Sequence, residues 1–473
     1  MLFNSYTYIF IFLPCVIIIF YYINIFLSAR TSKLWLILAS LFFYGYWNPK
    51  YLPLILISVS FNYGISAMLQ DRNDTKNVRN IFLFSGIIFN LGLLGYFKYS
   101  DFFIYNINVI FKLDIKLLNI ILPLAISFFT FQQISYLIDC YKIKNMATNF
   151  IDYCLYVTFF PQLIAGPIVL HSEMIPQFKI IGKGKFDYEK LSNGLFIFFI
   201  GLFKKAVIAD SFSIWANIGF NSTTELNFFT AWATSLSYTL QLYFDFSGYT
   251  DMALGSAYML NINLPINFNS PYKALNIQDF WRRWHITLGR FLRNYLYIPL
   301  GGNRNGTFNA IRNIFITFLL GGIWHGAGWG FVLWGGLHGA GFIIFRLWQN
   351  MNITLPKMVA WFITFNFVNI CWIFFRAETI DTAIRILKEM FGAKGWDNFN
   401  PLLNPIKSSF LFDYGIEIFM LLICIVLVVF SKNSIEMKSQ IKPSSFYAFF
   451  IAIVSVISLI FINTHSEFLY FQF

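Results

Sequence analysis

The residue that most clearly suggests chemistry is His325, in the stretch GGIWHGAGWGFVLWGG at positions 321–336. This stretch has no other ionisable side chain, and it is long enough to reach deep into a bilayer. An ionisable group is expensive to place in hydrocarbon, so His325 is a candidate functional residue. An imidazole there should be uncharged at neutral pH and suited to general-base catalysis on a hydroxyl. The alternative is a structural histidine that hydrogen-bonds a neighbouring helix.

A second histidine, His285, lies in the basic stretch DFWRRWHITLGRFLRNY at positions 279–295. Four arginines of this stretch share about a 100° arc of a helical wheel: Arg282, Arg283, Arg290 and Arg293. The pattern predicts one basic amphipathic helix at the cytoplasmic interface, with its aromatic side chains inward. Its guanidinium groups could anchor lipid headgroups or bind a phosphate-bearing ligand. His285, at the border of the two faces, could reach a buried cavity.

Glycines recur every four residues around His325, at Gly322, Gly326 and Gly330. If the segment is helical, they form a stripe without side chains on which a second helix can pack closely. The same stripe could leave a path beside His325. The remaining histidines are expected to be hydrogen-bonded or interfacial, and His338 is expected to support the site at most: His171, His338 and His465.

Carboxylates and prolines mark a further group of residues. YFDFSGYTDMA places Asp245 and Asp251 at the end of an apolar run that the Ser-Gly pair at 247–248 breaks. Carboxylates at that depth need partners, for which nearby arginines or the histidines are candidates. The following LPINFNSP, at 264–271, contains two prolines and cannot be a regular helix. Irregular backbone at membrane depth is expected where protein shields it or where it lines a cavity.

Membrane helices must position these residues, because 58% of the 473 residues are hydrophobic and only 12% are charged. In soluble domains about a quarter of the residues are charged. The apolar runs are continuous, as in helices, and do not alternate as in the strands of a membrane barrel. We therefore expect an all-α polytopic membrane protein with about eleven transmembrane helices plus re-entrant and interfacial helices. Residues 1–473 should form a single membrane domain with its motif-bearing core at 159–341.

Basic residues alternate between the loops that connect these runs. Those expected in the cytoplasm follow the first, third and fifth runs: Arg30, Lys33, Arg72, Lys76, Arg79, Lys142 and Lys144. This pattern predicts a multi-pass protein with its N-terminus in the periplasm, although Lys98, Lys112 and Lys116 fall in a loop expected outside. The formal charge of +12 indicates cytoplasmic loops and membrane lipid contacts, with no nucleic-acid partner. The cysteines contain no CxxC pair, so no metal site is expected.

Several blocks of sequence together resemble the membrane-bound O-acyltransferase family, in its branch of alginate and peptidoglycan O-acetylation. They are FFPQLIAGPI, YFDFSGYTDMA, LPINFNSPY, FWRRWHITLGRFLRNYLYIPLGGNRNG, LLGGIWHGAGWGFVLWGGLHG and the terminal FLYFQF. The resemblance implies His325 as the catalytic histidine and His285 as the second motif histidine. It also implies helices around a central tunnel or funnel. Leu170 departs from the pattern, since a basic residue follows the GPI motif in many relatives.

The resemblance further implies acyl transfer from a cytoplasmic thioester toward an exported polymer, through an extracytoplasmic esterase-like acetyltransferase partner. We expect a bacterial inner-membrane acetyltransferase that binds no resident cofactor and takes acetyl from acetyl-CoA. The final acceptors would be hydroxyls of a cell-wall or secreted polysaccharide, and His325 would act as general base. Further residues are expected to bind the donor or to support the histidines: Arg282, Arg283, Arg290, Trp324, Asp245 and Asn269.

Three alternatives stay open at this point. The enzyme could move D-alanyl groups from a carrier-protein thioester to a teichoic-acid-type polymer. A transporter of an acylated carrier is a second alternative, although the absence of a visible internal repeat argues against it. A scaffold for an extracytoplasmic partner is the third.

Overall fold

The computed structural model describes residues 1–473 except 72–73, 144–145, 147, 183–185, 222–225, 305, 394–407, 442–443, 463–467 and 470–473, and only the backbone of 408–414. Every regular element in the described residues is a helix of the α, 3-10 or π type, which confirms the predicted all-α class. Arg72, Lys144, His465 and most of the terminal FLYFQF lie outside the described residues.

Six helical segments in the described part of the chain are long and apolar enough to cross a membrane: Thr7–Phe26, Pro49–Leu69, Lys76–Phe111, Gly306–His325, Trp329–Gln349 and Lys357–Arg376. Two shorter apolar helices are Gly415–Phe430 and Ser445–Phe461. These segments agree with the prediction of a multi-pass membrane protein. The number of eleven crossings stays a prediction.

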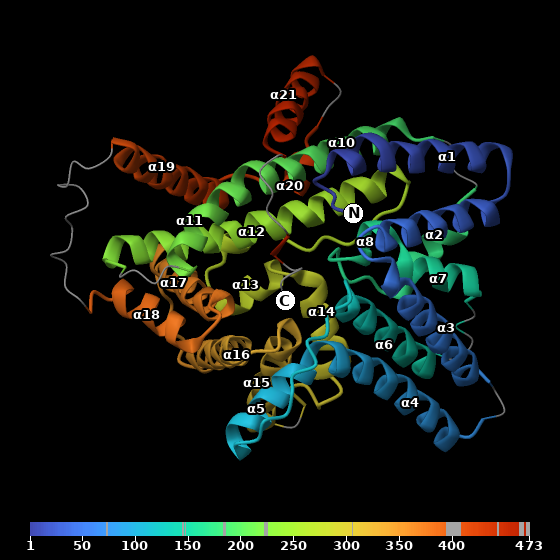
Figure 1. Ribbon diagram of the computed structural model, residues 1–473, viewed down its shortest axis with the longest axis horizontal. Coiled ribbons are helices and arrows are strands. Elements are labelled where there is room, and N and C mark those ends of the chain that lie inside the picture. The colour runs from blue at the N-terminus through green and yellow to red at the C-terminus, as the bar shows by residue number, and fades with distance from the viewer. Residues whose placement is uncertain are drawn as a thin grey trace. The chain divides into compact units, whose positions relative to one another are not determined.

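The chain divides into two compact units, Met1–Phe199 with Tyr249–Ile266, and Ile200–Gly248 with Asn267–Phe473. Elements that begin in the first unit are η1 (Thr7–Phe12), α1 (Leu13–Phe26), α2 (Ala29–Gly45), η2 (Pro49–Tyr51), α3 (Leu52–Leu69), α4 (Lys76–Leu94), η3 (Gly95–Tyr99), α5 (Ser100–Phe111), α6 (Ile126–Lys142), α7 (Phe150–Thr158), α8 (Phe160–Leu163), α9 (His171–Lys179) and α10 (Tyr188–Phe203). Figure 1 labels the α-helices of this list except α9. The single-domain assignment stays a prediction.

Elements that begin in the second unit are η4 (Lys204–Ala209), α11 (Asp210–Asn221), α12 (Phe228–Met259), η5 (Pro271–Lys273), α13 (Ile277–Arg283), α14 (Ile286–Leu292), η6 (Arg293–Tyr297), α15 (Gly306–His325), α16 (Trp329–Gln349), α17 (Lys357–Arg376), α18 (Ile380–Met390), α19 (Ser408–Phe430), α20 (Ser434–Lys438) and α21 (Ser445–Phe461). Both histidines of interest belong to this unit, so its local structure decides the site.

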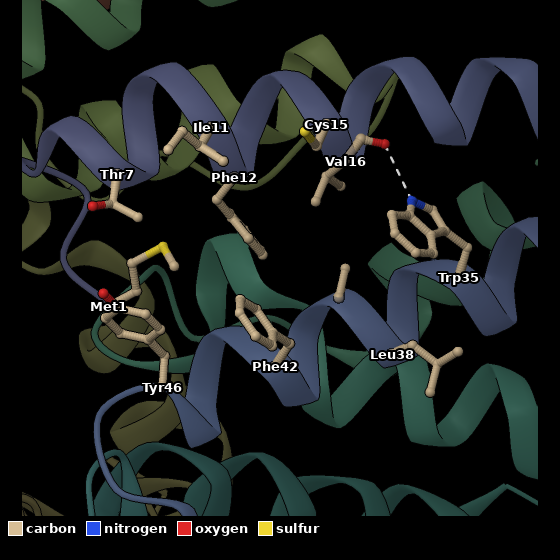
Figure 2. Close-up of a pocket in the computed structure, with 11 residues that line it drawn as sticks. Met1, Thr7, Ile11, Phe12, Cys15, Val16, Trp35, Leu38, Phe42 and Tyr46 are labelled. Atoms are coloured by element: carbon tan, nitrogen blue, oxygen red, sulfur yellow. Dashed lines mark hydrogen bonds between the residues drawn. The ribbon is translucent and has the colours of Figure 1, made fainter.

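In the first unit, η1 and α1 pack against α2 and leave an apolar pocket of 420 Å³ between them. Figure 2 shows this pocket, in which the indole nitrogen of Trp35 donates a hydrogen bond to the carbonyl oxygen of Val16 at 3.2 Å. Its lining is almost wholly hydrocarbon, and Thr7 supplies a hydroxyl. Thr7–Phe26 supplies one wall of the pocket and is a candidate membrane span, so an apolar wall is expected.

One expectation about the first unit is wrong. Lys98 was expected in an external loop, but it lies in the π-helical η3, inside the continuous helical segment Lys76–Phe111. Its ammonium group donates to the hydroxyl of Ser127 at 3.4 Å. Lysine is a good helix former, so its charge does not mark the end of a helix.

A second expectation fails in α12, which continues through the Ser-Gly pair at 247–248 instead of breaking there. A Cβ atom at Gly248 would lie 2.7 Å from the carbonyl oxygen of Gly201 on α10. Glycine at this position therefore allows close approach of another backbone within a regular helix. The irregular backbone predicted for LPINFNSP is confirmed, since residues 260–270, between the end of α12 and the start of η5, form no helix.

Candidate active site

His325 is the last residue of α15, and α16 begins after a short connection. The stretch at 321–336 is therefore a helical hairpin and not one helix (Figure 1). The three glycines are divided between its parts, with Gly322 on α15, Gly326 in the connection and Gly330 on α16. The three glycines therefore do not form one stripe along a single helix.

The two helices of the hairpin approach each other closely through glycine. A Cβ atom added to Gly322 would lie 2.9 Å from the Cα of Gly335 and 3.0 Å from its backbone nitrogen, closer than real Cβ contacts. In the connection, the ring of Phe331 occupies the space that a side chain at Gly326 would need. The glycines therefore serve close helix packing, as expected, and Gly326 does not open a path beside His325.

The side chain of His325 is buried, with 4% of its surface exposed, among aromatic rings. Ring centroids lie 4.9 Å away for Trp324, 5.0 Å for Trp334 and 5.3 Å for Phe375. The hairpin supplies the first two rings and α17 supplies the third. An imidazole in such surroundings is shielded from water.

His285 is the second buried histidine of the site, and its ring centroid lies 6.5 Å from that of His325. The ring centroid of His285 lies 6.5 Å from that of Trp324 and 4.9 Å from that of Phe246. The structure thus brings together the two histidines and the tryptophan that the sequence singled out. Burial lowers the pKa of His285 to about 3, so this imidazole is neutral throughout the physiological range.

The backbone at His285 corrects the prediction of one continuous helix over 279–295. Trp284 is extended and His285 has a left-handed φ of 42°, so α13 ends before them and α14 starts after them. Asn267 holds this break, because its side-chain oxygen lies 3.1 Å from Nδ1 of His285 and accepts hydrogen bonds from the amide and hydroxyl of Thr287. A wheel drawn through the stretch could not show the break.

Asn267 is a site residue that the sequence reasoning missed. Its backbone oxygen also accepts the amide hydrogen of Ile286 at 3.0 Å, so the irregular LPINFNSP segment and the helix break stabilise each other. The signal was available, since an asparagine in a proline-punctuated segment offers donors and acceptors that a buried histidine requires.

The expected arc of arginines does not form, because the helix is interrupted between Arg283 and Arg290. Arg283 forms an ion pair with Asp279 at 2.9 Å and donates to the backbone oxygen of Asn269 at 3.3 Å. Arg282 is exposed and Arg290 is half-buried. Arg283 and Asn269 therefore stabilise the local fold, and the predicted roles of Arg282, Arg283, Arg290 and Asn269 in donor binding or in support of the histidines stay predictions.

Asp245 is buried as expected, but its partner is neither an arginine nor a histidine. Lys205 lies 2.7 Å from Asp245 and 2.8 Å from Asp210, and all three side chains are at most 5% exposed. The backbone amide of Leu469 donates to the second oxygen of Asp245 at 3.0 Å. The sequence reasoning missed Lys205, although a lysine near the end of an apolar run implies a buried counter-ion.

His338 lies on α16 one helical turn after Trp334, and its ring centroid is 4.8 Å from that of Trp334. The side chain is fully buried. Its Nδ1 receives a hydrogen bond of 3.3 Å from the indole nitrogen of Trp281 on α13. His338 therefore contacts Trp334, which also contacts His325, and its supporting role stays a prediction.

The chain is similar to known proteins along its whole length. Residues 146–378 match the membrane-bound O-acyltransferase family, and the predicted core at 159–341 lies inside that range. The chain is 45% identical to a peptidoglycan O-acetyltransferase of Helicobacter pylori, over 100% of this chain and 98% of the relative. It is 40% identical to a probable alginate O-acetylase AlgI of Pseudomonas aeruginosa, over 84% and 76%. A teichoic acid D-alanyltransferase of Bacillus subtilis is 28% identical over 53% and 67%. The chain therefore belongs to the membrane-bound O-acyltransferase family and is an O-acyltransferase.

Proposed function

We propose that the enzyme takes an acetyl group from cytoplasmic acetyl-CoA and passes it across the bacterial inner membrane for O-acetylation of a cell-wall or secreted polysaccharide. The observation that carries this proposal is the pairing of two buried histidines, His325 and His285, within 6.5 Å in an aromatic environment. The full-length relative from Helicobacter pylori, named a peptidoglycan O-acetyltransferase, supports acetyl as the group and peptidoglycan as the first polymer to test.

His325 acts in this proposal as a general base. It accepts the proton of an acceptor hydroxyl while the hydroxyl oxygen attacks the thioester carbonyl carbon. The new C–O bond forms, the C–S bond breaks, and the thiolate leaves with the proton from the imidazolium. The product is an oxygen ester and free coenzyme A. A shielded imidazole suits this role because it is neutral before the reaction and therefore able to take up the proton.

His285 acts by position or by hydrogen bonding. Its Nδ1 lies 3.1 Å from the side-chain oxygen of Asn267, so Nε2 is the ring nitrogen that faces away from Asn267. We assign the general base to His325 and a positioning role to His285, whose Nδ1 is held by Asn267. We place the N-terminus in the periplasm and assign final transfer to an extracytoplasmic esterase-like partner.

The test is a proteoliposome assay with acetyl-labelled acetyl-CoA on the cytoplasmic side, the partner and polymer on the other, and free coenzyme A as the first readout. His325→Ala should abolish both coenzyme A release and polymer labelling, while the protein keeps its elution volume and tryptophan fluorescence. His171→Gln, a matched change at a buried histidine that bonds Thr148 at 2.7 Å in the other unit, should retain both. Wild-type transfer by His325→Ala would overturn the assignment.

A D-alanyl transferase is the second candidate, favoured by the Bacillus subtilis relative. The same vesicles distinguish it, because a D-alanyl carrier-protein thioester would then be consumed while acetyl-CoA would not. Movement of intact labelled donor without release of free thiol would indicate a transporter. Transfer that survives both histidine substitutions would indicate a scaffold.

A further inference from the structure

His338 is linked by a hydrogen bond to the element that carries His285. Trp281 lies on α13, four residues before His285, and its indole nitrogen is 3.3 Å from Nδ1 of His338. An indole nitrogen can only donate, so Nδ1 of His338 must be the unprotonated, accepting nitrogen. The ring is therefore neutral, and its proton is on Nε2.

The same ring also leads to His325. Trp334 has ring contacts with His338 at 4.8 Å and with His325 at 5.0 Å. Trp281 itself contacts Trp334 at 5.8 Å. His338 thus lies where the α13 element and the α15–α16 hairpin meet, and it contacts a side chain from each.

Asn267 holds His285 within its own segment, but the spacing between His285 and His325 also depends on how α13 meets the hairpin. It has only seven residues, and the chain directly after it is extended at Trp284 and left-handed at His285. Aromatic rings of α13 contact the hairpin, such as Trp281 with Phe318, whose ring centroids are 5.2 Å apart. Ring packing tolerates sliding, whereas a hydrogen bond in a buried, low-dielectric setting has a fixed length and direction.

We propose that His338 is a positioning residue whose hydrogen bond with Trp281 sets the spacing between His285 and His325. This inference rests on the proposed function, because the spacing matters only if both histidines take part in transfer. His338 touches neither reacting group. It fixes the register of α13 against α16 through Trp281, and it holds Trp334 against the ring of His325.

The experiment is a double-mutant cycle in the acetyl-CoA assay. Trp281→Phe keeps a ring and loses the N–H, and His338→Phe keeps a ring and loses the acceptor. Each should lower kcat by about tenfold to a hundredfold, the size of effect expected from a misplaced catalytic group, with the KM for acetyl-CoA nearly unchanged. The double variant should be no slower than either single variant, since both remove the same interaction.

Two further variants separate positioning from general damage. His338→Gln retains an acceptor oxygen and should recover much of the kcat that His338→Phe loses. Trp232→Phe removes a comparable indole hydrogen bond, to the backbone oxygen of Met390 at 3.0 Å, elsewhere in the same unit, and should keep the wild-type kcat. Wild-type kcat in Trp281→Phe and His338→Phe, or additive losses in the double variant, would overturn the proposal.

A measurement on the wild-type protein tests the inference without an activity assay. In ¹⁵N-histidine-labelled enzyme, His338 should show the tautomer protonated at Nε2, assigned by loss of its signals in His338→Phe. A neutral ring protonated at Nδ1, or a charged ring, would refute the hydrogen bond. If the double-mutant cycle gives wild-type kcat or additive losses while His325→Ala is inactive, the positioning role of His338 is wrong and the proposed function is retained. An active His325→Ala removes the proposed function itself.

Discussion

Substituting Gly322 by alanine tests whether the hairpin around His325 depends on close backbone contact. The added methyl group would meet the backbone of Gly335, with its Cα at 2.9 Å and its nitrogen at 3.0 Å, and also the carbonyl oxygen of Phe331. Backbone atoms of a packed helix cannot rotate away as a side chain can. Relief therefore requires α15 and α16 to move apart by several tenths of an ångström.

Overpacking of this kind costs about 1–3 kcal/mol. The free energy of unfolding, measured by denaturant titration in detergent micelles with tryptophan fluorescence, should fall by that amount in Gly322→Ala. Transfer should fall as well, because the displaced helix ends at His325. Gly336→Ala is the matched control, since no atom lies within 4 Å of a Cβ there and alanine favours the helix. Equal unfolding free energies for the two variants would refute the reasoning.

Two further predictions concern buried ionisable groups. Burial lowers the pKa of His285 from 6.5 to about 3, so the unfolded chain binds a proton between these values and the folded chain does not. The free energy of unfolding should then fall with decreasing pH below 6.5 by about 1.4 kcal/mol per unit more in the wild type than in His285→Asn, and parallel curves would contradict this. Lys205→Met should leave Asp210 and Asp245 without their cation and lower the free energy of unfolding by about 3–5 kcal/mol. Asp279→Asn, which breaks a half-exposed pair, should change it by less than about 1 kcal/mol, and a similar loss in both variants would show that burial is not the cause.

The sequence predicted the helical class and the importance of His325 and His285 because these depend on local properties. Long apolar runs can satisfy their backbone groups only as helices, and an ionisable residue within such a run is conspicuous.

The sequence did not predict features that depend on contacts between distant segments. The break at His285 exists because Asn267, far from it in the chain, supplies hydrogen bonds that a helix would otherwise provide. The Lys205 partner of Asp245 comes from another helix, and periodicity contains no information on such pairs. Lys98 was misplaced because a π turn within a helix has no simple residue pattern.

The left-handed backbone at His285 affects how substitutions at this position must be interpreted. Most L-amino acids lose about 1–2 kcal/mol in that conformation, while asparagine tolerates it well. An alanine at position 285 would thus combine loss of the imidazole with a strained main chain, and a glycine would loosen the junction of α13 and α14. His285→Asn separates the two effects, because asparagine tolerates the left-handed conformation and still offers a polar group to Asn267. His285 therefore contributes both its imidazole and its backbone conformation. Loss of activity on alanine substitution alone does not identify which of the two was lost.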